Sequence, residues 1–159
     1  MERQTSRETL HLSSFVIAKK KGAGDGAYSI LLLRAGDKHP LSFRRGKLVL
    51  PALFLDYGER PRDTARRVLS QELENPDSLE DPQFLGLQTW YASHWDIVFL
   101  FETWLKPGAR TPISKQPYVG AAFYPSDKLP IGEISEDHAD VLKELLHPSE
   151  ATAFSSTER

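Results

Sequence analysis

The run of residues 95–105 constrains the fold most, because its apolar density is that of a strand in the middle of a sheet. Residues 84–91 form a second long strand pattern just before it, separated by a three-residue turn. The most apolar stretches, 30–33 and 97–101, are much shorter than the roughly 20 residues that a membrane span requires. We therefore expect a sheet anchored by these two strands, with no membrane anchor.

Other segments show the periodicity and punctuation of strands and helices. A helix is expected over residues 62–74, because Pro61 suits a first turn, Asp63 favours its positive N-terminal end and apolar residues recur at helical spacing. Ser135 is a favourable N-cap for a closing helix that ends near residue 146. Further strands are expected at residues 10–18, 28–34, 47–50, 53–56 and 120–124, with loops at 35–46 and 106–118.

Composition favours one globular domain. The chain has 159 residues, of which 40% are hydrophobic and 26% charged, so a single domain can bury a sizeable core. We expect this domain to cover residues 1–146 and residues 147–159 to form a flexible tail. The absence of cysteine excludes a disulfide framework and Cys-based metal sites. It favours a cytoplasmic location, and no export signal is visible.

Charge is distributed unevenly, although the formal net charge is only −2. Residues 34–67 carry nine Lys or Arg against four Asp or Glu, whereas residues 68–105 carry seven acids and no Lys or Arg. The basic stretch either attracts a phosphate-bearing partner or, together with the acidic stretch, keeps the protein soluble.

A motif surrounds the first predicted helix. From Leu50 the chain reads Leu-Pro-Ala-Leu-Phe-Leu-Asp-Tyr-Gly-Glu-Arg-Pro, and residues 65–72 read Ala-Arg-Arg-Val-Leu-Ser-Gln-Glu. This segment resembles the Nudix box, G-x5-E-x7-R-E-U-x-E-E-x-G-U with U aliphatic. The residues that fit its spacing are Glu59, Arg67, Leu69 and Glu72.

The resemblance extends beyond the box. The leading Leu-Pro, the Gly-Glu-x-Pro turn and residues 123–130, Phe-Tyr-Pro-Ser-Asp-Lys-Leu-Pro, are also similar to common Nudix features. Together these features cover most of the chain. They imply an α/β fold of the Nudix type, an α/β/α sandwich with a mixed β-sheet between helices.

The box departs from the family pattern at its carboxylates. Leu53 and Glu74 stand at its two glycine positions, and Val68 and Gln71 replace the first and second helix glutamates. In the family, glutamates at these three helix positions bind divalent ions, and positions i, i+3 and i+4 share one helix face. Glu72 alone remains. The resemblance therefore implies Mg²⁺ or Mn²⁺ only as a weakly held ion at Glu72, because Mg²⁺ prefers carboxylate oxygens.

The resemblance names Glu59, Arg67, Gln71 and Glu72 as the catalytic positions. We interpret Glu59 and Arg67 as structural, because a carboxylate near a helix N-terminus and a guanidinium two turns later can brace the loop. Glu72 is either a remnant metal ligand or an ordinary helix glutamate.

Aromatic and basic side chains supply candidate ligand contacts. Trp90, Tyr91 and Trp95 flank the turn between the two long strands, and such rings can stack on a nucleobase. The alternative is that at least one of Trp90 and Tyr91 belongs to the core, because neighbours in a strand point to opposite faces. The basic candidates are either phosphate contacts or a solvated charge cluster: Arg44, Arg45 and Lys47.

The histidines do not point to a metal site or to catalysis. None of the five shows metal-ligand spacing, and none is assigned a catalytic role: His11, His39, His94, His138 and His147.

Three functions remain open. The first is a binding module with weak or no hydrolysis, whose partner is a nucleotide or nucleoside-diphosphate derivative, an RNA segment or a protein. The second is a divalent-metal-dependent hydrolase of nucleoside-diphosphate-linked compounds that uses Glu72 and an acid from outside the box. The third is a purely structural subunit that pairs as a homodimer. The outside acids considered are Glu133, Glu136 and Asp137.

Overall fold

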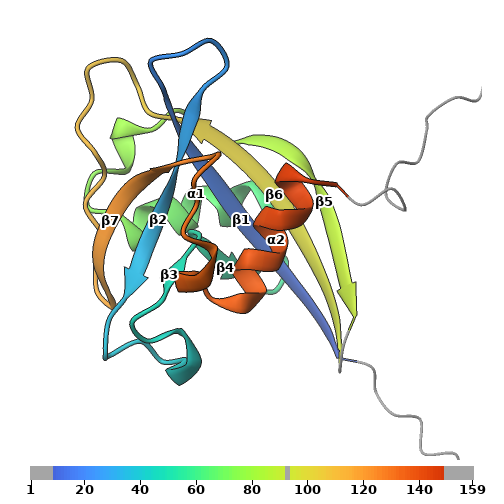
Figure 1. Cartoon of the computed structure of the whole chain (residues 1–159). Coiled ribbons are helices and arrows are strands. Elements are labelled where there is room, and N and C mark those ends of the chain that lie inside the picture. Colours follow the sequence, from blue (N-terminus) through green and yellow to red (C-terminus); the bar gives the residue numbers. More distant parts are fainter. Residues whose placement is uncertain (1–8, 92–93, 149–159) are drawn as a thin grey trace, which may run out of the picture.

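The protein is built on one seven-stranded mixed sheet (Figure 1). The computed structural model describes residues 9–91 and 94–148. The strands follow the order β3-β2-β1-β6-β5, with β4 paired to β1 and β7 paired to β2. Strands β1 and β6 run parallel, and the other pairs of described strands are antiparallel. The bounds are β1 (Leu10–Lys21), β2 (Tyr28–Ala35), β3 (Leu48–Val49), β4 (Ala52–Phe54), β5 (Gln83–Tyr91), β6 (Trp95–Trp104) and β7 (Tyr118–Pro125).

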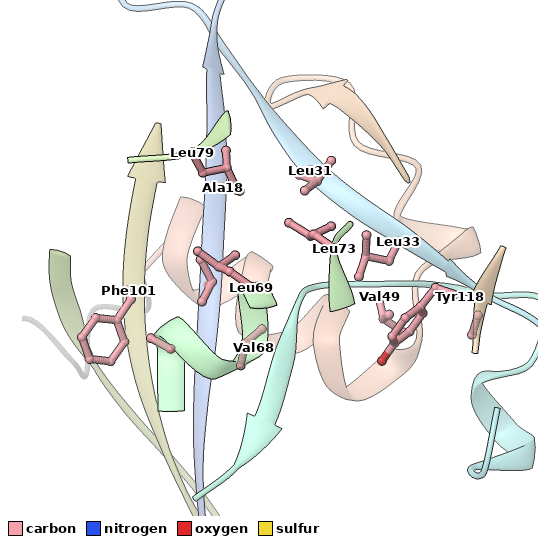
Figure 2. Packing of buried hydrophobic residues seen from close by; sticks show 13 residues of the cluster. Ala18, Leu31, Leu33, Val49, Val68, Leu69, Leu73, Leu79, Phe101 and Tyr118 are labelled. Atoms are coloured by element: carbon pink, nitrogen blue, oxygen red, sulfur yellow. The ribbon is translucent and has the colours of Figure 1, made fainter. Parts of the chain in front are cut away.

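Two helices cover opposite faces of this sheet. Successive side chains of β1 point to opposite faces, and the row that includes Val16 packs in one core cluster with α1 (Pro61–Glu72). The alternate row, which includes Ile17, packs in a second cluster with α2 (Glu136–Leu146). Figure 2 shows the cluster on the α1 side. The expected α/β/α sandwich with a mixed sheet is therefore confirmed.

Helix α1 begins with Pro61, as its restricted φ favours. The turn before it contains Gly58, whose φ is +78°. Residues that carry a Cβ atom rarely adopt this backbone conformation. The helix ends at Glu72 rather than at the expected residue 74, because Leu73 is extended, fully buried and bridged to Ser114. Burial of Leu73 in the core thus shortens the helix directly after the last box glutamate.

Helix α2 begins after Ser135, which occupies the expected N-cap position. Its side chain makes no capping bond to the helix backbone; instead the Ser135 hydroxyl donates to Oδ1 of Asp137 over 2.7 Å. The expected N-cap position of Ser135 is therefore confirmed, although its hydroxyl is engaged by Asp137 rather than by the helix backbone.

Strand ends differ from the expected ranges by a few residues. Strand β1 continues to Lys21 because Lys19–Lys21 pair with the start of β2, which a pattern of apolar residues does not reveal. Strand β7 begins at Tyr118, two residues earlier than expected, because this buried residue pairs with Ala35. The pieces expected at 47–50 and 53–56 shorten to β3 and β4. Three short 3-10 helices complete the fold: η1 (Ser42–Arg44), η2 (Pro76–Ser78) and η3 (Ile131–Glu133).

No helix among the described residues is long and apolar enough to cross a membrane. The turn between the long strands includes residues 92–93, and the expected tail includes residues 149–159; both segments lie outside the described residues. The single-domain assignment of residues 1–146 stays a prediction.

Candidate functional site

A cavity of about 800 Å³ opens between the C-terminal end of α1, strand β4, the loop that carries η1, the β5–β6 hairpin and α2. Gln71 and Glu72 of the box line one wall. Trp90 and Val98 line the hairpin side, and Asp137 lies on the α2 side. The box helix therefore contributes to a concave site of the size that holds a small molecule.

Glu59 and Arg67 form the brace that their spacing indicates. Arg67 donates from Nε to Oε2 of Glu59 and from Nη2 to Oε1, each over 2.9 Å. It also donates from Nη2 to the backbone oxygen of Phe54 over 2.8 Å. The guanidinium thereby joins α1 to the loop before it and to β4.

The same carboxylate collects further donors. The Thr64 hydroxyl and the Asp56 backbone N–H both donate to Oε1 of Glu59. The hydrogen bond from Arg67, followed by that from Thr64, lowers the pKa of Glu59 to about 2. Glu59 is thus a charged structural group whose two oxygens are already engaged.

The three positions of α1 that correspond to the box glutamates have separate environments. Val68 is fully buried in the α1-side cluster, as Figure 2 shows. Gln71 is exposed and lines the cavity with an uncharged amide. Glu72 is only 4% exposed. A substitution that restored glutamate at Val68 would therefore bury a charge in the core.

Glu72 is held by a tyrosine from β7. The Tyr118 hydroxyl donates to Oε1 of Glu72 over 3.1 Å, and Oε2 has no hydrogen-bond partner among the described residues. Burial raises the pKa of Glu72 to about 8, and the bond from Tyr118 offsets this only in part. The last box glutamate is therefore largely a neutral acid at pH 7.

Two other cavity-lining side chains carry unpartnered atoms. His138 accepts the backbone N–H of Leu50 at Nδ1 over 2.9 Å, so the imidazole is neutral there, and burial lowers its pKa. Its Nε2 is buried without a hydrogen-bond partner, as is Nε of Arg44. Arg44 donates instead from Nη2 to Asp137. Buried polar atoms normally have a hydrogen-bond partner, so these two unpartnered atoms are unusual.

The cavity brings together half of the predicted ligand contacts. Arg44, Trp90 and Tyr91 line it. Trp90 also packs against the α2-side core and donates from Nε1 to Gln88, so it is partly a core residue.

The other three lie elsewhere. Arg45 donates from Nε to the backbone oxygen of His39, and Lys47 is exposed outside the cavity lining. Trp95 stacks on Tyr91 with ring centroids 4.9 Å apart but does not line the cavity.

A group of side chains missed by sequence reasoning lies beside the cavity. His11, His94 and Asp96 come together so that one ligand atom of each lies within 4.8 Å of the others. The linear spacing of the histidines does not reveal this proximity of His11, His94 and Asp96. The only sequence signal is His94 two residues before Asp96, and His11 joins them through a parallel strand pairing that linear spacing does not display.

The sequence and the fold were compared with those of known proteins. No family model and no curated protein matches the sequence. Solved structures do match the fold. The MutT NUDIX hydrolase from Burkholderia pseudomallei aligns with 87% of this chain and 99% of its own, at 16% identity and a TM-score of 0.62. The NUDIX domain of Shewanella oneidensis NrtR, complexed with ADP ribose, aligns over 91% and 92%, at 16% identity and a TM-score of 0.60.

This chain has the Nudix fold. The Caenorhabditis elegans Ap4A hydrolase, solved as a binary complex, aligns over 86% of this chain and 95% of its own at 15% identity, with a TM-score of 0.61. A MutT/nudix family protein from Enterococcus faecalis is longer: this chain spans 47% of it, at 14% identity and a TM-score of 0.55.

The divalent ions implied by the Nudix resemblance do not fit the box helix of this chain. Mg²⁺ requires several hard oxygen ligands, usually charged carboxylates. Here one position is a buried valine, one is an amide, and the one carboxyl is buried and protonated near neutral pH. Among residues 9–91 and 94–148, Glu72 belongs to no group of three or more His, Asp or Glu side chains close enough to share an ion.

The acids from outside the box are engaged elsewhere or exposed. Glu133 pairs with Arg34 at 3.4 Å, and Asp137 pairs with Arg44. Glu136 is an exposed residue in the first turn of α2 and does not line the cavity. Asp137 is the one outside candidate that lines the cavity.

Proposed function

We propose that this Nudix-fold domain is a binding module that holds a nucleotide or nucleoside-diphosphate derivative in its cavity, with weak or no hydrolysis. The observation that carries the proposal is a set of unpartnered buried polar atoms on three residues that line the cavity: Nε of Arg44, Oε2 of Glu72 and Nε2 of His138. Two of them are donors, and the protonated Glu72 offers either a donor or an acceptor. Hydrogen-bonding groups of this kind are the ones that recognise a base or a sugar.

The rest of the lining supports a nucleoside inside the cavity. Trp90 and Tyr91 bring aromatic rings, and Val98 and Val141 bring apolar surface. Solved structures with this fold include one complexed with ADP ribose and one of an Ap4A hydrolase. For this chain we propose a ligand of the same class, bound by the polar and aromatic groups of its own cavity.

The absence of a fitting metal cage supports the second half of the proposal. Hydrolysis of a diphosphate relies on divalent ions that activate water and neutralise phosphoryl oxygens. The box helix offers one buried, protonated carboxyl, Glu72, for that task. RNA, a protein partner and the homodimer stay predictions.

A thermal-shift screen tests the binding module directly. The panel contains ADP-ribose, nucleoside diphosphates, dinucleoside polyphosphates and a short RNA. A ligand at about 100 times its dissociation constant stabilises the fold by about 2.7 kcal/mol, which raises the Tm on the order of 5–10 °C for a domain near this size. A shift with the RNA alone would favour the RNA partner. No shift with any compound at millimolar concentration would contradict the proposal.

A further inference from the structure

The group formed by His11, His94 and Asp96 has the dimensions of a metal site. Nδ1 of His11 lies 3.6 Å from Oδ1 of Asp96, and Nε2 of His94 lies 3.1 Å from Oδ2. Two ligands on a tetrahedral Zn²⁺ ion with bonds of roughly 2.0–2.1 Å are about 3.3–3.4 Å apart. The two measured separations fall on either side of that value, and one ligand atom of each residue lies within 4.8 Å of the others.

The backbone holds these ligands in register. In the parallel pairing of β1 with β6, His11 lies directly beside Asp96. His94 lies in the bend directly before β6, two residues before Asp96, and its Nε2 reaches Oδ2 of Asp96. The imidazole rings of His11 and His94 have centroids 4.2 Å apart, and Phe54 packs edge-on against His11 at 5.4 Å. Two of the three ligands thus come from paired strands of the sheet, and His94 comes from the bend directly before β6.

The ligand set selects a class of metal. Two imidazoles and one carboxylate suit Zn²⁺ and the neighbouring first-row transition ions, whereas Mg²⁺ prefers oxygen ligands alone. Each of the three side chains is about one third exposed, so an ion has access from solvent. Three protein ligands also leave room for a further ligand on the ion.

The location connects the group to the cavity. Asp96 and Phe54 line the cavity wall. Among the described lining residues Arg44 is the only Lys or Arg, and it is already paired with Asp137. Asp140 adds another carboxylate to the lining. A cation beside Asp96 would therefore bring positive charge to a site that has little of its own.

We propose that His11, His94 and Asp96 bind one divalent transition-metal ion of the Zn²⁺ class at the wall of the cavity. This site is separate from the box helix and uses none of its residues. Binding of the ion needs no nucleotide, so the test below stands whether or not the proposed nucleotide binding is found.

Calorimetric titration of the metal-free protein with Zn²⁺, and absorption spectroscopy with Co²⁺, test the site without a nucleotide. We expect one ion per chain, a Co²⁺ spectrum typical of nitrogen and oxygen ligands, and no displacement by excess Mg²⁺. Loss of an outer-shell partner of a metal already weakens affinity about 10–100-fold. The single changes His11→Gln, His94→Gln and Asp96→Asn are therefore each expected to weaken Zn²⁺ binding by at least about tenfold.

Matched controls separate the site from general histidine binding. His147→Gln and Asp127→Asn change exposed residues outside the group and should leave the affinity unchanged. Circular dichroism of each metal-free variant checks that it folds. The proposal is overturned if wild type binds no Zn²⁺ at micromolar concentration, if Mg²⁺ competes equally, or if the affinity survives all three changes in folded protein.

Discussion

The Tyr118 hydroxyl donates a hydrogen bond of 3.1 Å to Oε1 of Glu72, and this bond joins the last strand of the sheet to the last residue of the box helix. Both residues are less than 10% exposed. The bond uses the remaining box glutamate as a buried, neutral acceptor within the core. A metal ion at Glu72 would therefore have to displace both this hydrogen bond and a proton.

Removing the tyrosine hydroxyl should lower the stability of the fold. Tyr118→Phe keeps the ring packing but removes the side-chain hydrogen bond to Glu72, and a buried polar group that loses its partner costs about 1–3 kcal/mol. Denaturant unfolding at pH 7 measures the loss. Tyr57→Phe, a change at a fully exposed residue, is the control and should have little effect. Equal stability of Tyr118→Phe and wild type would refute a buried bond.

The raised pKa of Glu72 predicts a pH dependence of opposite sign to that of an ordinary glutamate. Between the unfolded value of 4.5 and the folded value of about 8, the folded state binds more protons than the unfolded state. The free energy of unfolding therefore falls as pH rises through this window. Glu72→Gln lacks this ionisation, so wild type should lose stability relative to the variant between pH 5 and 9. The exposed change Glu74→Gln is the matched control.

Sequence reasoning identified the fold and the brace because both depend on local patterns. Helical spacing from Pro61 onward and the separation of Glu59 from Arg67 can be read along the chain. The environment of Glu72 could not be read in this way, because it depends on Tyr118 from β7, 46 residues later. For the same reason the proximity of His11, His94 and Asp96 was missed.

The brace between Glu59 and Arg67 predicts a second pH effect, at acid pH. The pKa of Glu59 is lowered to about 2 from 4.5, so its contribution to stability is present above pH 4.5 and is lost as pH falls toward 2. Glu59→Gln should have a lower Tm than wild type at pH 7, and the two melting curves should converge below pH 4. Glu80→Gln, at an exposed position, should show no such convergence. A Tm difference that is constant with pH would contradict the ion pair.

Tyr91 offers a test of ligand stacking at the cavity. It is 62% exposed yet lines the cavity, so Tyr91→Ala removes a candidate stacking surface with little loss of core packing. Loss of one base–aromatic stack costs about 1–3 kcal/mol, or roughly 5–150-fold in affinity. Calorimetry with the strongest ligand of the thermal-shift panel measures it. Tyr57→Ala is the control, and equal losses in both variants would argue against stacking at Tyr91.

The most direct test of the central claim is hydrolysis of nucleoside-diphosphate derivatives in Mg²⁺ or Mn²⁺ by wild type, Glu72→Gln and the control Glu74→Gln. Each 1.36 kcal/mol of lost transition-state stabilisation lowers the rate tenfold, so loss of a charged metal cage lowers it by several orders of magnitude. We expect wild type to show no turnover that depends on Glu72. Robust turnover in wild type and Glu74→Gln that disappears in Glu72→Gln would contradict it and identify the protein as a hydrolase.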